Sequence, residues 1–113
     1  MTIKELIPLI EAKELTKVAD LNKEVLCGYT CDLLSWVMGH GQEGMAWVTV
    51  QTHMNVIAVA LLSDMACVIM PEGIEMEKES LDKADAEGMC VLQSPLSSYE
   101  ICGRMHEKGV PAE

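Results

Sequence analysis

Three clusters of polar side chains have the types and spacing expected of a binding site. Each cluster follows a short apolar segment and precedes a segment whose apolar residues have helical spacing. Carboxylate, hydroxyl, carboxamide and imidazole groups bind small polar ligands through hydrogen bonds. The candidate ligand-binding residues are Tyr29, Asp32, Ser35, Gln51, Thr52, His53, Asn55, Ser94, Ser97 and Ser98.

The same residues have a structural interpretation. Asp32, Thr52 and Ser97 precede segments with helical spacing, and Asp, Thr and Ser are preferred N-cap residues because they accept hydrogen bonds from free backbone N–H groups. His53 can act as a base or an anion contact beside a helix N-terminus, or it can be an ordinary neighbour of the cap. The sequence leaves ligand binding and helix capping as alternatives.

The sequence contains no complete catalytic or metal-binding motif. His40, His53 and His106 lack the spacing of metal ligands, and the Cys27 and Cys31 pair does not match a zinc half-site. Neither the G-x-S-x-G nucleophile elbow nor the phosphate-binding G-x-x-x-x-G-K-[ST] motif occurs. We therefore predict no catalytic residue, no metal, no cofactor and no enzymatic activity.

The elements that must position these residues centre on Met45–Met70. Met45–Val50 is β-branched and aromatic, as buried strands are, and Ala66–Met70 is an apolar run that ends before a proline. Between them, Thr52 is the predicted N-cap of a helix over His53–Leu62. Two strands joined by a helix are expected to pair in parallel.

The central helix has almost no polar face. Apolar residues occupy every position of Val56–Leu62, so one side of the helix must pack on the sheet and the other needs a second apolar cover. We expect a second subunit to supply that cover. The sequence therefore predicts a homodimer formed through the Val56–Leu62 helix.

The remaining segments complete an α/β pattern. Strands that alternate with helices predict a mostly parallel sheet with helices on both faces, within a single domain over residues 1–113. The helix of residues 31–38 is expected to direct Leu33, Leu34, Val37 and Met38 inward. The other expected elements are a helix over 3–10 with a capping box of Thr2 and Glu5, an edge strand Glu14–Val18, a strand Glu24–Thr30, a charged helix Met76–Glu87 closed by Gly88, a strand Met89–Leu92, a helix over 98–108 and a ragged tail from Gly109.

Composition restricts the partners and the location. Eighteen acidic residues against eight basic ones give a net charge of -10, and such a surface repels the phosphate backbone of nucleic acids. Polar residues interrupt the longest uncharged run, Met45–Ser63, so we predict no membrane span. Charged residues at positions 4 and 5 argue against a secretory segment, and the odd number of cysteines, five, fits a reducing cytoplasm.

Three stretches carry a resemblance to a known family. The segments GYTCDLLS at 28–35, WVTVQTHMN at 47–55 and SPLSSYEICG at 94–103 resemble small stand-alone DRTGG domain proteins. Such domains are similar to the N-terminal domain of HPr kinase/phosphorylase and also occur beside CBS domains. The resemblance implies an α/β fold of the MurF and HPr kinase N-domain type, with a regulatory or ligand-sensing role. The literal Asp-Arg-Thr-Gly-Gly string is absent, and the corresponding turn reads Gln51–Asn55.

Two functional hypotheses follow. The first is a sensor that binds a small, possibly nucleotide-like ligand at the three strand-to-helix junctions and transmits its occupancy through a dimer interface. The second is an interaction module or accessory subunit that recruits a partner enzyme through its apolar helix without any ligand. The two hypotheses differ in whether the junction residues bind a ligand or only stabilise helix ends.

Overall fold

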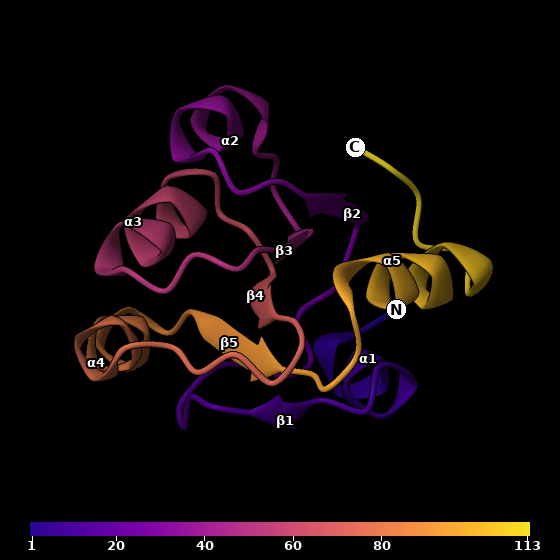
Figure 1. The fold of residues 1–113 in the computed structure, drawn as a ribbon, viewed down its shortest axis with the longest axis horizontal. Coiled ribbons are helices and arrows are strands. Elements are labelled where there is room, and N and C mark those ends of the chain that lie inside the picture. The colour runs from indigo at the N-terminus through magenta and orange to yellow at the C-terminus, as the bar shows by residue number, and fades with distance from the viewer.

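The structure is a computed structural model that describes residues 1–113. Five helices and five strands make up the fold (Figure 1). In chain order they are α1 (Ile3–Leu9), β1 (Lys13–Glu14), β2 (Cys27–Thr30), α2 (Leu34–His40), β3 (Met45–Val48), α3 (Met54–Leu62), β4 (Cys67–Met70), α4 (Lys78–Glu87), β5 (Cys90–Gln93) and α5 (Ser98–Glu107).

The strands form one sheet in the order β1-β5-β4-β3-β2. Strands β2 to β5 are parallel, and β1 pairs antiparallel with β5 at one edge. Each parallel strand is joined to the next by a helix, as the length of a parallel crossover requires. The prediction of a mostly parallel α/β sheet is confirmed.

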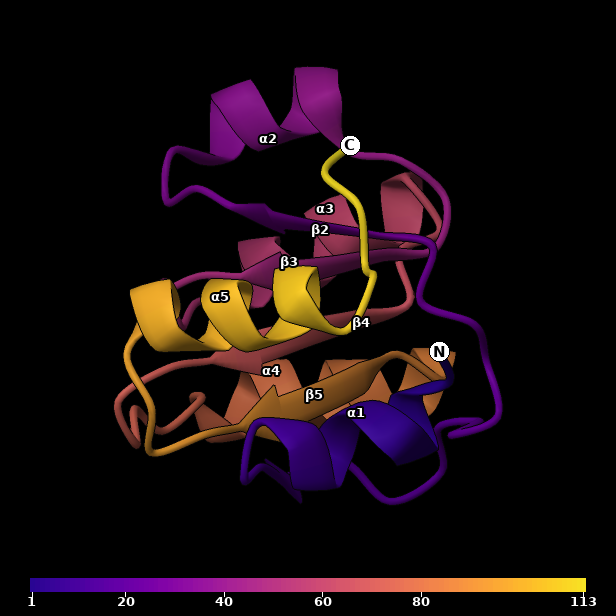
Figure 2. The same cartoon turned by 90° about the vertical axis from the view of Figure 1, so that its right-hand side faces the viewer.

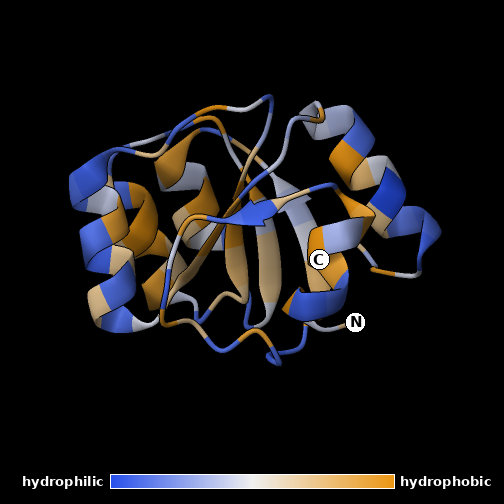
Figure 3. Ribbon diagram, turned by 90° about the horizontal axis from the view of Figure 1, so that it is seen from below, coloured by the Kyte–Doolittle hydropathy of each residue, from blue (hydrophilic) through white to orange (hydrophobic).

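Helices cover both faces of the sheet. Helices α2, α3 and α4 pack on one face, and α1 and α5 pack on the other. Successive strand residues alternate between the two cores: Trp47 and Val68 face α2, α3 and α4, whereas Val48 and Ile69 face α1 and α5. Figure 3 shows the apolar strands between helices whose outer surfaces are more hydrophilic.

The central strand-helix-strand unit forms as predicted, but its strands are shorter, Met45–Val48 and Cys67–Met70, and its helix starts later. His53 is the N-cap of α3, and its Nδ1 atom accepts a hydrogen bond from the backbone N–H of Asn55 at 3.1 Å. The prediction that Thr52 is the N-cap is therefore wrong. The helix begins one residue later than expected, and the Thr52 hydroxyl donates instead to the carboxylate of Glu77.

The predicted ends of three other helices are confirmed. Thr2 and Glu5 form a reciprocal capping box at α1, and the Ser97 hydroxyl accepts from the backbone N–H of Glu100 at the start of α5. Gly88 ends α4 in the left-handed conformation with φ 75°. A residue without Cβ adopts this conformation at low cost.

The first edge strand and helix α2 differ from the predictions. Strand β1 covers only Lys13–Glu14, because the Thr16 side chain, not a continuing strand, accepts from the backbone N–H of Val91. Helix α2 packs inward through Val37, while Leu33 is 63% and Met38 is 53% exposed. The expected inward direction of Leu33 and Met38 is wrong, because a single two-turn helix presents only one side to the sheet.

The C-terminal segment is packed against the molecule. Val110 is buried, and the backbone N–H of Gly28 donates to the carbonyl of Pro111 at 2.8 Å. A bridge between Gly28 and Ala112 extends this contact along the free edge of β2. Figure 2 shows the segment running from the end of α5 across β2. The prediction of a ragged tail is wrong, because the free edge of β2 supplies a hydrogen-bonding partner.

Helix α3 is covered within the subunit on most of its circumference. Val56, Ile57, Val59 and Ala60 are buried, and α3 lies between α2 and α4. The apolar cover that was expected from a second subunit is therefore supplied largely by neighbouring helices, while Leu62 remains 69% exposed. None of the five helices has the length and apolar character needed to cross a membrane.

Candidate functional site

The loops that follow the parallel strands meet at one edge of the sheet. Because β2, β3, β4 and β5 run in the same direction, their carboxyl ends share that edge. The three predicted junctions therefore lie on a common edge. The β4–α4 loop separates the second junction from the third, since β4 lies between β3 and β5.

Asp32 connects the first two junctions. Its Oδ1 atom accepts from the Thr49 hydroxyl at 2.8 Å and from the backbone N–H of Val50 at 2.9 Å. The Gln51 amide returns a hydrogen bond to the Asp32 carbonyl at 2.9 Å. The indole N–H of buried Trp47 donates to the Cys31 carbonyl at 2.9 Å. Asp32 thus fastens one loop to another and caps no helix: the N-cap of α2 is Leu33, which makes no side-chain capping bond.

Thr52 connects the second junction to α4. Its hydroxyl donates to Glu77 Oε2 at 3.0 Å, and its carbonyl accepts from the buried Ser80 hydroxyl at 2.8 Å. Next to it, His53 uses Nδ1 as the capping acceptor, which requires the neutral tautomer with the proton on Nε2. The side chains of Gln51, His53 and Asn55 are exposed at this junction.

The third junction is held by contacts of its own. Ser94 is fully buried and donates to the Ile10 carbonyl at 2.6 Å, while the Gln93 amide donates to the carbonyls of Gly73 and Ile74. Ser97 is the cap of α5. The structure therefore brings Asp32 and Gln51 together but leaves the predicted serines at 94, 97 and 98 beyond the β4 loop.

Tyr29 and Ser35 complete the predicted set. Tyr29 lies on β2, where it packs against the core beneath α2, α3 and α4, and burial raises the pKa of its phenol. Ser35 is exposed in the first turn of α2. Both residues flank the Asp32 loop, but neither hydrogen-bonds to Asp32 in the structure.

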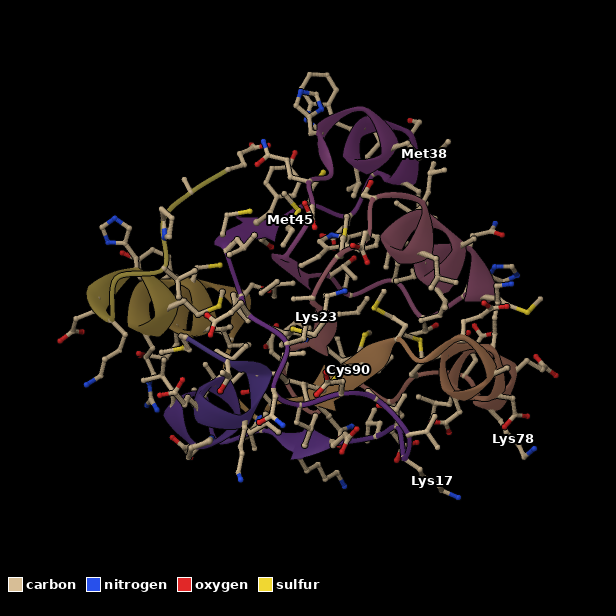
Figure 4. The ribbon with its side chains drawn as sticks, turned by 180° about the vertical axis from the view of Figure 1, so that it is seen from behind. Lys17, Lys23, Met38, Met45, Lys78 and Cys90 are labelled. Atoms are coloured by element: carbon tan, nitrogen blue, oxygen red, sulfur yellow. The ribbon has the colours of Figure 1, made fainter.

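An apolar groove between α2 and α3 was not predicted as a site. It has a volume of about 420 Å³, and we call it the α2–α3 groove. Met38 lies on the outer side of α2, next to α3, whereas Met45 lies inside the molecule (Figure 4). The six residues that line the groove are Leu34, Met38, Asn55, Ala58, Val59 and Leu62.

Further apolar side chains are exposed beside this groove. The exposed fractions are 63% for Leu33, the N-cap of α2, 55% for Trp36 in α2 and 42% for Met54 in α3. The Trp36 ring stacks on the His40 ring, with the two centroids 4.5 Å apart. The available signal was the apolar residues Leu33, Leu34, Trp36, Val37 and Met38, which lie close together in sequence and which a two-turn helix cannot all bury. Clustered exposed apolar side chains are typical of interaction surfaces.

Comparisons with known proteins identify a similar fold. No family model and no curated protein matches the sequence. A solved structure of the CBS and DRTGG domains of the regulatory region of Clostridium perfringens pyrophosphatase, complexed with the activator diadenosine tetraphosphate, matches with a TM-score of 0.72 at 12% identity. The match covers 97% of this chain and 47% of that chain, so this chain spans about half the length of its neighbour. The fold is DRTGG-like, as the sequence resemblance implies.

Proposed function

We propose that this chain is a non-catalytic regulatory domain that works by docking through the α2–α3 groove. The observation that carries the proposal is the open groove of about 420 Å³ with exposed apolar side chains on and beside it. Leu62 and Met38 are 69% and 53% exposed, although their neighbours Val59 and Val37 are buried. A regulatory role is supported by the likeness in fold to the regulatory region of a pyrophosphatase.

The occupant that we propose for the groove is a second copy of the chain. Helices α2 and α3 contain no Asp, Glu, Lys or Arg, although the chain carries a net charge of -10. Two copies that meet through this neutral surface bury no carboxylate and keep their acidic surfaces apart. This arrangement is the homodimer predicted from the central helix, with Leu62 and Ala58 at the interface together with α2.

The oligomeric state tests this proposal. The wild type should elute in size-exclusion chromatography with light scattering at twice the 12.4 kDa monomer mass, and Leu62→Asp should shift it to the monomer. Tyr99→Asp is the matched control, because Tyr99 is 90% exposed on α5 outside the groove. A wild type that stays monomeric at high concentration, or a Leu62→Asp variant that remains dimeric, contradicts the proposal.

A second candidate function is a small-ligand sensor at the strand-to-helix junctions. Exposed Gln51, His53 and Asn55 beside Asp32 offer hydrogen-bonding groups there. The likeness to a regulatory region complexed with diadenosine tetraphosphate supports a nucleotide-like ligand. A dimer formed through the neighbouring α3 can then transmit ligand occupancy. We place the protein in the cytoplasm, where its five thiols stay free.

Thermal unfolding with a panel of nucleotides tests the sensor. A ligand at a hundred times its dissociation constant adds about 2.7 kcal/mol to stability, which raises the Tm by roughly 10 °C in a domain of this size. Asp32→Ala should abolish the ligand-induced rise relative to its own unliganded Tm, whereas Ser97→Ala should keep it. If no nucleotide of the panel changes the wild-type Tm, the sensor hypothesis is contradicted and docking through the α2–α3 groove remains the proposed activity.

A further inference from the structure

Helix α3 has a histidine at its N-cap, a position where Ser, Thr, Asp and Asn are preferred. The Nδ1 atom of His53 accepts a hydrogen bond from the backbone N–H of Asn55 at 3.1 Å, and the His53 backbone is extended, as an N-cap requires. The first turn of α3 contains no acidic residue that could supplement this cap. The side-chain capping of α3 therefore depends on the protonation state of one imidazole.

Only the neutral imidazole can act as this cap. Both nitrogens of a protonated ring are donors, so protonation turns Nδ1 from an acceptor into a donor that faces the Asn55 N–H. The positive charge is also unfavourable at a helix N-terminus, where the free N–H groups make the local field positive. Histidine is the side chain that ordinarily changes its charge between pH 5 and pH 8, and His53 is exposed to solvent. Acid should therefore break the cap.

Charged side chains on the neighbouring elements do not replace the cap. Helix α3 lies between α2 and α4 (Figure 1). Helix α2 has no Asp, Glu, Lys or Arg, and its one histidine, His40, lies in its last turn. The charged residues on the loop before α2, on the β4–α4 loop and at the start of α4 are Asp32, Glu72, Glu75, Glu77, Lys78 and Glu79.

Two of these carboxylates already have partners beside His53. Asp32 accepts from Thr49 and Val50, and Glu77 accepts from the Thr52 hydroxyl. A protonated His53 ring that is attracted to Glu77 gives up the capping position. A ring that stays in place carries a proton on Nδ1. In both cases the Asn55 N–H loses its acceptor.

The capped turn of α3 forms one end of the α2–α3 groove. Asn55, whose N–H makes the capping bond, lines the groove, and Met54 next to it is 42% exposed. The N–H groups of a first turn have no partner within the helix, so the turn frays more readily without its cap. The buried residues from Val56 to Ala60 hold the rest of the helix. Loss of the cap therefore alters one end of the docking surface and leaves the core intact.

We propose that His53 is a pH-sensitive cap that holds the first turn of α3 in place near neutral pH and releases it in acid. The contribution of the cap to stability is present above the pH range in which the imidazole titrates and is lost below it. The same step weakens docking, because Asn55 and Met54 belong to the released turn. The effect on docking rests on the function proposed for the α2–α3 groove, whereas the loss of the cap does not.

Thermal unfolding at pH 7.5 and at pH 5.0, at one protein concentration, tests the cap with two variants. His53→Asn keeps a capping oxygen at both pH values, and His53→Ala has no acceptor at either. The wild-type Tm should match that of His53→Asn at pH 7.5 and fall to that of His53→Ala at pH 5.0, a relative loss of roughly 4 °C. Protonation of carboxylates affects all three proteins and cancels in this comparison.

Ser97→Ala is the matched control. The Ser97 hydroxyl caps α5 through the backbone N–H of Glu100 and does not titrate in this range, so its loss should lower the Tm equally at both pH values. Two further measurements follow the consequences of His53 protonation. The backbone amide shift of Asn55 should follow the titration of the His53 ring. Light scattering should show the dimer dissociation constant of the wild type rising roughly fivefold from pH 7.5 to pH 5.0 relative to that of His53→Asn.

Three results would overturn the pH-sensitive cap. They are the same pH dependence of the Tm in the wild type and His53→Asn, a His53→Ala variant as stable as the wild type at pH 7.5, and an Asn55 amide shift that stays constant while His53 titrates. A wild type that is monomeric at both pH values contradicts the homodimer, and the Tm and the Asn55 amide still decide the cap. A dissociation constant with equal pH dependence in the wild type and His53→Asn contradicts the effect on docking.

Discussion

At the residue scale, the Asp32 carboxylate fastens the loop after β2 to the loop after β3. Its Oδ1 atom accepts the hydroxyl of Thr49, which is only 1% exposed, and the backbone N–H of Val50. Asp32→Ala should lower the free energy of unfolding by about 1–3 kcal/mol, because it removes the acceptor of a buried donor. Asp32→Asn keeps an oxygen at this position and should cost less than half as much. Urea unfolding of both variants measures the difference, and equal losses would show that the carboxylate charge matters more than the acceptor.

The sequence predicts the role of a single residue only where that role depends on residue type and local position. Residue type and position identified Asp32 and Gln51 as polar groups at strand ends, and the structure brings them together. The pairing of Asp32 with Thr49, and of Ser94 with Ile10, joins residues 17 and 84 positions apart, and no local pattern contains such information. Whether His53 or Thr52 is the N-cap of α3 depends on where the backbone first becomes helical. The N-cap preferences of residue types do not determine that position.

At the scale of elements, the end of α4 gives a direct test. Gly88 has φ 75°, and an alanine in this conformation is strained by roughly 1 kcal/mol. Gly88→Ala should therefore lower the Tm by roughly 4 °C. Gly103→Ala is the opposite control, because Gly103 lies inside α5 with open space around it. It should raise stability by roughly 0.5–1 kcal/mol. Thermal unfolding of both variants checks the pair, and a shift of the same sign in both would contradict this explanation.

Elements with strong local signals were predicted, and elements that depend on distant partners were not. The capping box at Thr2, the glycine after α4 and the apolar strands β3 and β4 are each determined by neighbours in sequence. The C-terminal segment is ordered by the edge of β2, about eighty residues earlier. The exposed face of α2 follows from its two-turn length and its position over the edge of the sheet. Neither feature leaves a periodic pattern in the sequence.

At the scale of the whole molecule, the sheet is buried on both faces and its thiols are sealed inside. Cys67 and Cys90 are opposite each other on β4 and β5 in the core beneath α1 and α5. Burial raises the pKa of the Cys67 thiol well above its ordinary value. Burial, with a contribution from the Glu14 carboxylate, raises the pKa of Cys90 to about 12. Because burial raises the pKa of these two thiols, the stability of the fold should depend on pH in the alkaline range.

The sign of this link follows from the protons bound in each state. Above the ordinary thiol pKa of 9.0 the unfolded chain loses the Cys90 proton, whereas the folded chain keeps it up to about pH 12. The unfolded state then binds fewer protons, so stability should fall as pH rises from 9 to 12, by up to about 1.4 kcal/mol per pH unit for this thiol. Cys90→Ala should start less stable at pH 7, because it leaves a small cavity, but should lose stability more slowly between pH 9 and 11. Urea unfolding at each pH gives both slopes, and equal slopes in the two proteins would show that the Cys90 thiol is already ionised in the fold or titrates alike in both states.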